Sequence, residues 1–98
     1  MNGKKVVARN SRDLAKVLGL SDSDRVAMDV QLALVGQIGS EVLRSGITHT
    51  ALARLAMSSR PRITAILNGN LEGVSTDLLL RILAALGVRV ELKFRRAA

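Results

Sequence analysis

The most regular pattern of apolar and polar positions lies in residues 24–44. Four apolar side chains recur there at every fourth position and so share one side of a helix: Val30, Leu34, Ile38 and Val42. Alternating Ser and Asp at residues 21–24 supply a cap and first-turn acids, which suit the exposed amides at a helix start. We therefore predict a helix over residues 24–44 that ends at Gly46, a residue suited to a left-handed cap.

Two glycines, Gly36 and Gly39, stand in the middle of this predicted helix. Each costs about 1 kcal/mol relative to Ala in a helix interior. Close approach of a neighbouring helix or of a second subunit would account for both glycines.

Four shorter patterns predict further helices, over residues 11–18, 48–56, 59–67 and 76–86. A polar residue suited to capping stands at or just before the start of each one: Ser11, Thr48, Ser59 and Ser75. The apolar side chains that we expect to face the core from the last three helices are Leu52, Ala53, Leu55, Ile63, Ile66, Leu67, Leu79, Ile82, Leu83 and Leu86.

The pattern changes at the C-terminal end, where residues 88–95 alternate strictly between apolar and charged side chains. This alternation predicts a half-buried β-strand. One strand cannot satisfy its own backbone groups, so it needs a partner. Residues 5–8, the same strand of a second subunit, or an edge on another protein could supply that partner, and the strand is the best sequence evidence for a dimer.

The net charge of the chain limits the classes of partner that it suits. Fifteen Lys and Arg against eight Asp and Glu leave a net charge of +7, and eleven of the cations are Arg. Arginine presents a planar donor fork that suits phosphates and guanine edges, so the excess favours a nucleic-acid partner over a merely soluble basic surface. Phe94 is the only aromatic residue, which leaves no platform for stacking single-stranded bases. Double-stranded nucleic acid is therefore the expected partner.

Other kinds of site find little support. The chain has no cysteine, and His49 is the only histidine, so we expect no metal site and no cofactor. The acids Asp13, Asp22, Asp24 and Asp29 have no recognisable nucleophile or metal beside them, and we expect no enzyme activity. No apolar stretch resembles a signal peptide or approaches the length of a membrane span, which predicts a cytoplasmic protein without membrane contact.

The segment from Ile47 to Gly69 carries most of the functional information. It predicts two short helices joined by a tight turn, with Pro61 in the first turn of the second helix, where a missing amide hydrogen costs nothing. Arg60, Arg62 and Thr64 are left facing outward. An exposed first turn with two arginines suits a helix that enters the major groove by its N-terminus.

This segment resembles the helix-turn-helix of the lambda-repressor-like, or Xre, family of bacterial regulators. The resemblance rests on His49, Ala53, the turn at Met57-Ser58, Ile63 and the closing Leu67-Asn68-Gly69. Residues 74–88 further resemble a compact subgroup whose members often act as antitoxins in HigBA-type toxin–antitoxin pairs. Two departures from the family stand out: Met57 replaces the usual glycine of the turn, and His49 replaces the usual glutamine.

The resemblance implies roles for individual residues. Those expected to contact bases are Arg60, Pro61, Arg62 and Thr64, and those expected to contact phosphates are Thr48, His49, Ser59 and Asn68. The alternatives are plainer: the arginines could lie on a solvated helix face, His49 could be an ordinary exposed side chain, and Asn68 could simply end a helix. The basic residues among positions 1–12 could track the DNA backbone or minor groove, or have no role.

Together these observations predict an all-α fold of about five helices with a lambda-repressor-like helix-turn-helix and one C-terminal β-strand. Residues 1–20 would form a basic arm and short helix, and residues 21–98 the DNA-binding domain. The expected function is a homodimeric, sequence-specific transcriptional regulator that reads a palindromic operator of double-stranded DNA through the major groove and represses its own operon. The alternatives are an antitoxin that binds and neutralises a small RelE- or HigB-like toxin protein, and a binder of duplex nucleic acid without sequence preference.

Overall fold

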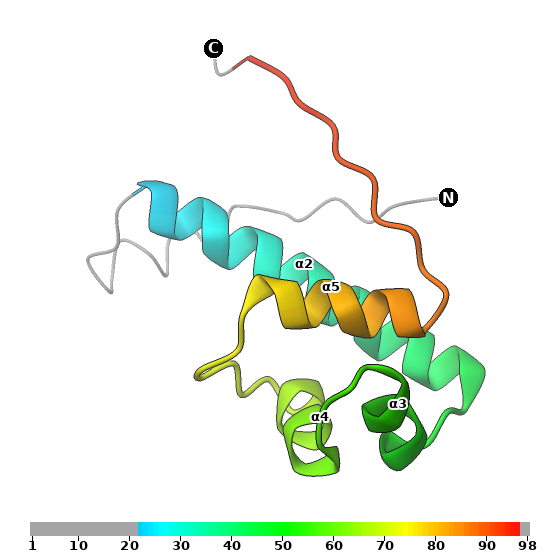
Figure 1. Ribbon diagram of the computed structural model, residues 1–98. Coiled ribbons are helices and arrows are strands. Elements are labelled where there is room, and N and C mark those ends of the chain that lie inside the picture. Colours follow the sequence, from blue (N-terminus) through cyan, green and yellow to red (C-terminus); the bar gives the residue numbers. More distant parts are fainter. Residues whose placement is uncertain (1–21, 97–98) are drawn as a thin grey trace.

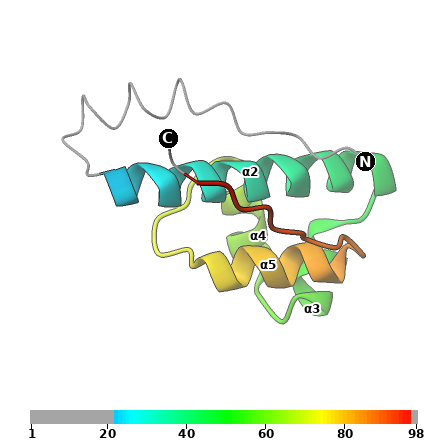
Figure 2. The ribbon, with the colours of Figure 1, turned by 90° about the horizontal axis from the view of Figure 1, so that it is seen from above.

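Four helices make up the folded part of the chain in the computed structural model, which describes residues 22–96. They are α2 (Asp22–Ser45), α3 (His49–Leu55), α4 (Arg60–Leu67) and α5 (Thr76–Ala85). Helix α5 lies alongside the long α2, and α3 and α4 lie together at one side of this pair (Figures 1 and 2). The four helices predicted in this part of the chain are therefore confirmed, whereas the helix predicted over residues 11–18 lies outside the described residues.

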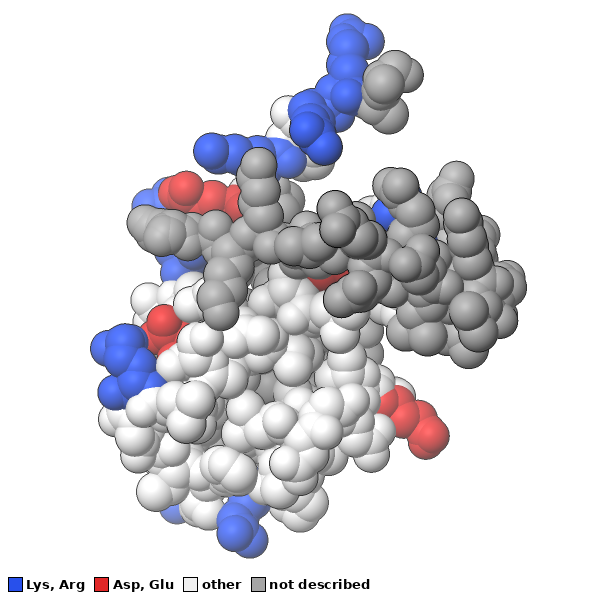
Figure 3. All heavy atoms as spheres, turned by 180° about the vertical axis from the view of Figure 1, so that it is seen from behind, with Lys and Arg blue, Asp and Glu red and all other residues white. Residues whose placement is uncertain are grey.

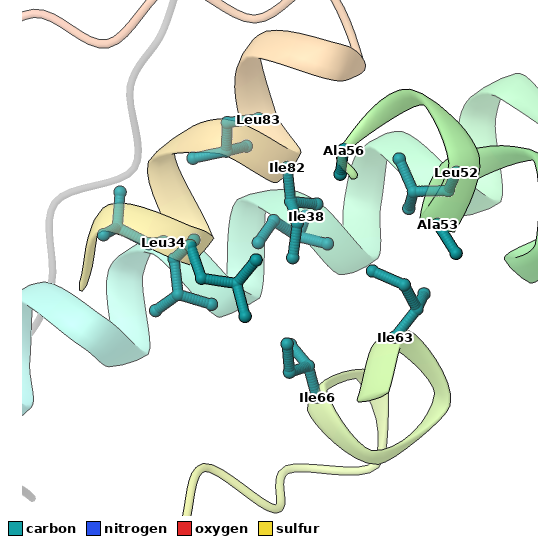
Figure 4. Close-up of a cluster of buried hydrophobic side chains, with 11 residues drawn as sticks. Leu34, Ile38, Leu52, Ala53, Ala56, Ile63, Ile66, Ile82 and Leu83 are labelled. Carbon is teal, nitrogen blue, oxygen red and sulfur yellow. The ribbon is translucent and has the colours of Figure 1, made fainter. Parts of the chain in front are cut away.

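The hydrophobic core joins all four helices (Figure 4). Its fully enclosed side chains lie below 2% exposure, and the largest are Ile38, Leu52, Ile63, Ile66, Leu79, Ile82 and Leu83. Leucine and isoleucine dominate this list, as expected for short helices that pack closely without aromatic residues. The three short helices, α3, α4 and α5, depend on these contacts, because helices of 7 to 10 residues are marginal in isolation.

One expected core position, Leu55, is wrong, and one residue of the predicted apolar side of α2, Val30, is also exposed. Leu55 at the end of α3 is 61% exposed, and Val30 in the first half of α2 is 44% exposed. Both residues fit the apolar periodicity of their helices. Periodicity shows which side of a helix is apolar, but it does not show how far along the helix a neighbouring element covers that side. The buried residues of α2 are Leu34 and Ile38, in the middle of the helix.

The two glycines inside α2 do not mark a close approach of another part of the described chain. A Cβ atom added at Gly36 or at Gly39 would meet no atom within 4 Å outside the local helix backbone. No helix among residues 22–96 therefore packs tightly against these glycines, and a second subunit remains the other expected cause. Gly46, in contrast, adopts the predicted left-handed conformation at the end of α2, with φ of 69°.

The predicted C-terminal strand is not formed. Residues 88–96 leave the end of α5 as an irregular segment, and no strand occurs among residues 22–96 (Figure 1). The physical reason is that a strand needs hydrogen bonds to a neighbour, and the described part of this single chain offers none. Leu92 and Phe94 are accordingly 75% and 88% exposed.

Helix α2 also departs from the expectation that no stretch of the chain matches a membrane span. By length and composition alone, residues 23–45 are long and apolar enough to cross a bilayer. In this fold, however, α2 packs against α4 and α5, and Ile38 is fully buried between them. One helix of this kind is weak evidence for a membrane span, and only 11% of its apolar window is buried inside the described chain.

Candidate nucleic-acid interface

Helix α3 begins at a capped N-terminus that is open to solvent. The Oγ1 atom of Thr48 accepts a hydrogen bond from the Ala51 backbone N–H at 3.1 Å, as predicted for an N-cap. Thr48 itself is exposed, and His49 at the first helical position is half-buried. Leu52 and Ala53 on the opposite side are buried in the core, so the packing fixes which side of α3 faces outward.

The turn between α3 and α4 depends on a strained residue. Met57 has φ of 57°, the left-handed region that residues with a Cβ atom rarely adopt. Its side chain is 83% exposed, so burial of the thioether does not compensate for the strain. The turn is closed by a hydrogen bond from the Ser58 backbone N–H to the Ala53 carbonyl oxygen at 2.8 Å. The glycine that the resemblance leads one to expect is therefore absent, and the turn forms nonetheless.

Helix α4 presents its first turn to solvent. The Oγ atom of Ser59 caps the helix by accepting a hydrogen bond from the Arg62 backbone N–H at 3.2 Å. Arg60, Pro61 and Arg62 are all exposed, whereas Ile63 directly after them is 1% exposed and anchors the helix in the core. The sequence prediction that two arginines flank a proline on an exposed first turn is confirmed.

The two arginines differ in their surroundings. Among residues 22–96, Arg60 forms no ion pair or hydrogen bond through its side chain, so its guanidinium is open to a ligand. The Nη1 atom of Arg62 lies 3.4 Å from the carbonyl oxygen of Gly73 in the loop after α4, a long and exposed hydrogen bond. In the view of Figure 3, cationic side chains protrude at the lower end of the molecule, which α3 and α4 occupy.

Thr64 is placed differently from its two arginine neighbours. Its Oγ1 atom lies 2.8 Å from Nδ1 of His49, which joins the second turn of α4 to the first residue of α3. Both side chains are half-buried. The hydroxyl of Thr64 is therefore already engaged within the protein. His49 on α3 therefore also braces α4.

A shallow hollow beside α4 adds a residue that the sequence reasoning missed. The first turn of α4, through Pro61 and Arg62, and the loop that follows the helix, through Asn70 and Glu72, line it. Ala65 also lines this hollow, one helical turn after Pro61. Its position four residues after Pro61 could have shown that the two share a face.

The far end of α4 is closed by Asn68. This residue is the C-cap, and its backbone N–H bonds back to the carbonyl oxygens of Thr64 and Ala65 at 3.0 and 3.1 Å. Its side chain is exposed and has no hydrogen bond within residues 22–96. The amide group of Asn68 is therefore free to contact a ligand at the end of the helix opposite to Ser59.

Two long-range hydrogen bonds hold the interface in place, and no local sequence pattern predicts them. The Nε atom of Arg81 on α5 donates to the carbonyl oxygen of Ala56 in the turn at 3.1 Å. The Nε2 atom of Gln31 on α2 donates to the carbonyl oxygen of Val74 at 3.3 Å and so fastens the loop after α4. Both residues position the interface without belonging to its outer surface.

The described residues contain no group of three or more His, Asp or Glu side chains that could hold a metal ion. The outward side of α3 and α4 offers guanidinium, hydroxyl, amide and imidazole groups. Such groups suit the oxygen and nitrogen atoms along a nucleic-acid duplex.

Comparison with known proteins gives a family for this architecture. A family model described as a helix-turn-helix domain matches residues 12–95, a range that includes all four described helices. No curated protein and no solved structure gives a significant match.

Proposed function

The chain belongs to the helix-turn-helix domain family, and from this premise we propose that it is a sequence-specific regulator that reads double-stranded DNA through the major groove. Proteins with this DNA-binding domain are typically not enzymes. The observation that carries the proposal is the exposed first turn of α4, where Arg60 and Arg62 flank Pro61 on a helix anchored by Ile63. Helix-turn-helix proteins insert the N-terminal residues of their second helix into the groove.

Base contacts are assigned to the outer face of α4. Arg60, whose guanidinium is unpaired within residues 22–96, suits the two acceptors of a guanine edge. Arg62 needs only to leave its 3.4 Å contact with Gly73 to do the same. Pro61 and the methyl group of Thr64 offer apolar contacts of the kind that a thymine methyl group accepts.

We assign the phosphate contacts to the two ends of α4, the proposed reading helix, and to the start of α3. Thr48 and Ser59 stand at helix N-termini, where exposed backbone amides favour an anion. Asn68 offers an exposed amide at the other end of α4. His49 has one ring nitrogen committed to Thr64, and the other is left for a phosphate oxygen.

The oligomeric state and the form of the operator belong to the same proposal. We propose a homodimer that binds a palindromic operator, with half-sites about one helical turn apart or a multiple of it. Repression of its own operon in the cytoplasm, as in the Xre-like regulators that the sequence resembles, is the corresponding biological role. Neutralisation of a small toxin remains the alternative that the sequence resemblance raises.

The test is selection of bound sequences from a pool of random duplex DNA, with the full chain and two double variants. Arg60→Lys with Arg62→Lys keeps the net charge but removes the planar donor forks. Arg60→Ala with Arg62→Ala removes both. We expect the natural chain to enrich one palindromic motif, because each good bidentate base contact discriminates by about 1–3 kcal/mol.

The lysine variant separates specificity from general attraction. We expect it to keep salt-sensitive binding while losing preference at the guanines that the arginines read, because phosphate attraction needs only charge. The alanine variant should lose the motif as well. If the natural chain binds DNA with strong salt dependence but enriches no motif, the proposal of a sequence-specific regulator is wrong.

A further inference from the structure

The C-terminal segment, residues 88–96, combines strand-like alternation with an absence of partners inside the described chain. It begins on the core: Val88 packs against the buried cluster, and its backbone N–H donates to the Leu83 carbonyl oxygen at 2.9 Å. Beyond that point, exposure of the apolar side chains rises from 40% at Val90 to 75% at Leu92 and 88% at Phe94. Such a sequence of exposed apolar groups on an unpaired backbone is what a second strand would cover.

We propose that residues 88–96 of two copies of this chain pair as antiparallel strands with Leu92 on the twofold axis. The proposal deepens the proposed function, since a palindromic operator requires a symmetric dimer and this pairing would supply one. The occupant of the exposed segment is thus a second copy of the same segment.

The sequence of the segment is complementary to itself in this register. With Leu92 opposite Leu92, Val90 lies opposite Phe94 of the second copy on the same face. On the other face, Glu91 lies opposite Lys93 of the second copy, which places opposite charges together. Twofold symmetry repeats each of these pairs, so the central part of the ribbon has matched apolar pairs on one side and matched ion pairs on the other.

Neighbouring registers are less favourable. Centring the pair on Glu91 or on Lys93 places two like charges directly opposite each other, which destabilises an antiparallel pair. Centring it on Val90 requires Phe94 to lie opposite Leu86, the residue that caps α5, so the ribbon would run into the helix end. The charges and the end of α5 therefore favour the register centred on Leu92 over these three.

The ends of the segment are already extended, but they pair less favourably than its centre. In the single chain, Arg89 already lies 3.8 Å from Glu91, as side chains two residues apart do on one face of an extended backbone. The pairing brings Arg89 opposite Arg95 only at the solvent-exposed ends, where water and salt screen the charges. The segment also leaves the bundle on the side away from α4, so the pairing keeps the reading helix accessible (Figures 1 and 2).

Single-cysteine variants of the full chain test this register directly, because the natural chain contains no cysteine. Residues directly opposite in an antiparallel pair have Cα atoms about 4.5–5.5 Å apart, within the range that a disulfide spans. Under mild oxidation without DNA, Leu92→Cys should therefore form a covalent dimer. Val90→Cys should form little, because the two copies of that position lie about 13 Å apart along the ribbon. A mixture of Val90→Cys and Phe94→Cys chains should form the mixed dimer.

Charge exchange provides a second, independent readout by sedimentation equilibrium. Glu91→Lys opposes like charges at two places in the ribbon, and we expect the dimer dissociation constant to rise by about tenfold. Adding Lys93→Glu to the same chain restores opposite charges in the proposed register and should recover most of that loss. The residues lie in an exposed segment, so neither change disturbs the core.

The outcomes separate this proposal from the proposed function. Oxidation of Val90→Cys to dimer as readily as Leu92→Cys would overturn the register, and a monomeric natural chain would overturn the pairing altogether. A tail that pairs instead with residues 5–8 or with a toxin would also leave Leu92→Cys uncrosslinked. If the pairing fails while a palindromic motif is still enriched, the regulator stands and its dimer contact lies elsewhere. If the covalent dimer forms but no motif is enriched, the pairing stands and the regulator fails.

Discussion

The Nδ1 atom of His49 lies 2.8 Å from the Oγ1 atom of Thr64, so the first residue of α3 is bonded directly to the second turn of α4. Apart from core packing, this is the side-chain contact that ties the two helices of the helix-turn-helix to each other in the described chain. It fixes the angle at which the first turn of α4 is presented.

Removing this contact should lower stability by a small, coupled amount. We expect His49→Ala and Thr64→Val each to lower the free energy of unfolding by about 1 kcal/mol, the usual worth of one hydrogen bond. Because both changes remove the same bond, the double variant should lose less than the sum of the two. Chemical denaturation of the four chains gives this coupling, and strict additivity would show that the contact contributes nothing.

His49→Gln serves as the matched control, since the glutamine amide can also reach across to a hydroxyl. We expect it to recover much of the stability lost in His49→Ala. We also expect it to recover DNA affinity, because the brace on α4 would be restored.

Substitutions of Ser59, the N-cap of α4, can separate its structural role as a cap from its proposed contact with DNA. Ser59→Ala removes the acceptor of the Arg62 N–H and should lower stability by about 1 kcal/mol. Ser59→Asp keeps a good capping oxygen but places a negative charge at the proposed phosphate contact. The aspartate variant should therefore unfold at nearly the natural temperature and bind DNA much more weakly. Equal DNA affinity of the aspartate variant and the natural chain would place Ser59 away from the phosphates.

Met57 provides a test of backbone strain. Its φ of 57° is costly for a residue with a Cβ atom, and its side chain is 83% exposed, so little burial is lost on truncation. We expect Met57→Gly to raise the free energy of unfolding by about 1 kcal/mol. Met57→Ala is the control that removes the side chain but keeps the strain, and it should leave stability nearly unchanged. An equal gain in both variants would mean that the methionine side chain, and not the backbone, is unfavourable.

The elements that could be predicted from the sequence are those whose signals are local. Ser59, Pro61 and the apolar spacing of Ile63 and Ile66 lie within one short segment, and together they specify where α4 begins and which side it buries. The exposure of Arg60 followed from the same pattern. Most of the candidate interface was therefore predictable, because a helix start and its outward face are encoded by residues three or four positions apart.

The errors concern relationships between distant residues. Leu55 fits the apolar side of α3, yet nothing in the helix itself shows that its neighbours stop short of that position. The bond from Arg81 to the Ala56 carbonyl spans 25 residues, and the bond from Gln31 to the Val74 carbonyl spans 43. The alternation of residues 88–95 shows that a strand is possible but not which chain pairs with it.

The glycines of α2 offer a last test, which also bears on where a second subunit docks. Outside the local helix backbone, no atom of the described chain lies within 4 Å of a Cβ atom built at Gly36 or Gly39, so alanine fits at both places. We expect Gly36→Ala and Gly39→Ala each to raise the free energy of unfolding by about 1 kcal/mol through helix propensity. For a domain of this size, that gain raises the melting temperature by about 4–8 °C. Ala27→Gly, an exposed position of the same helix, should produce the opposite change and so calibrates the effect. If alanine instead weakens dimer formation in sedimentation equilibrium, a second subunit packs on these glycines, and the dimer contact lies on α2 and not on the C-terminal segment.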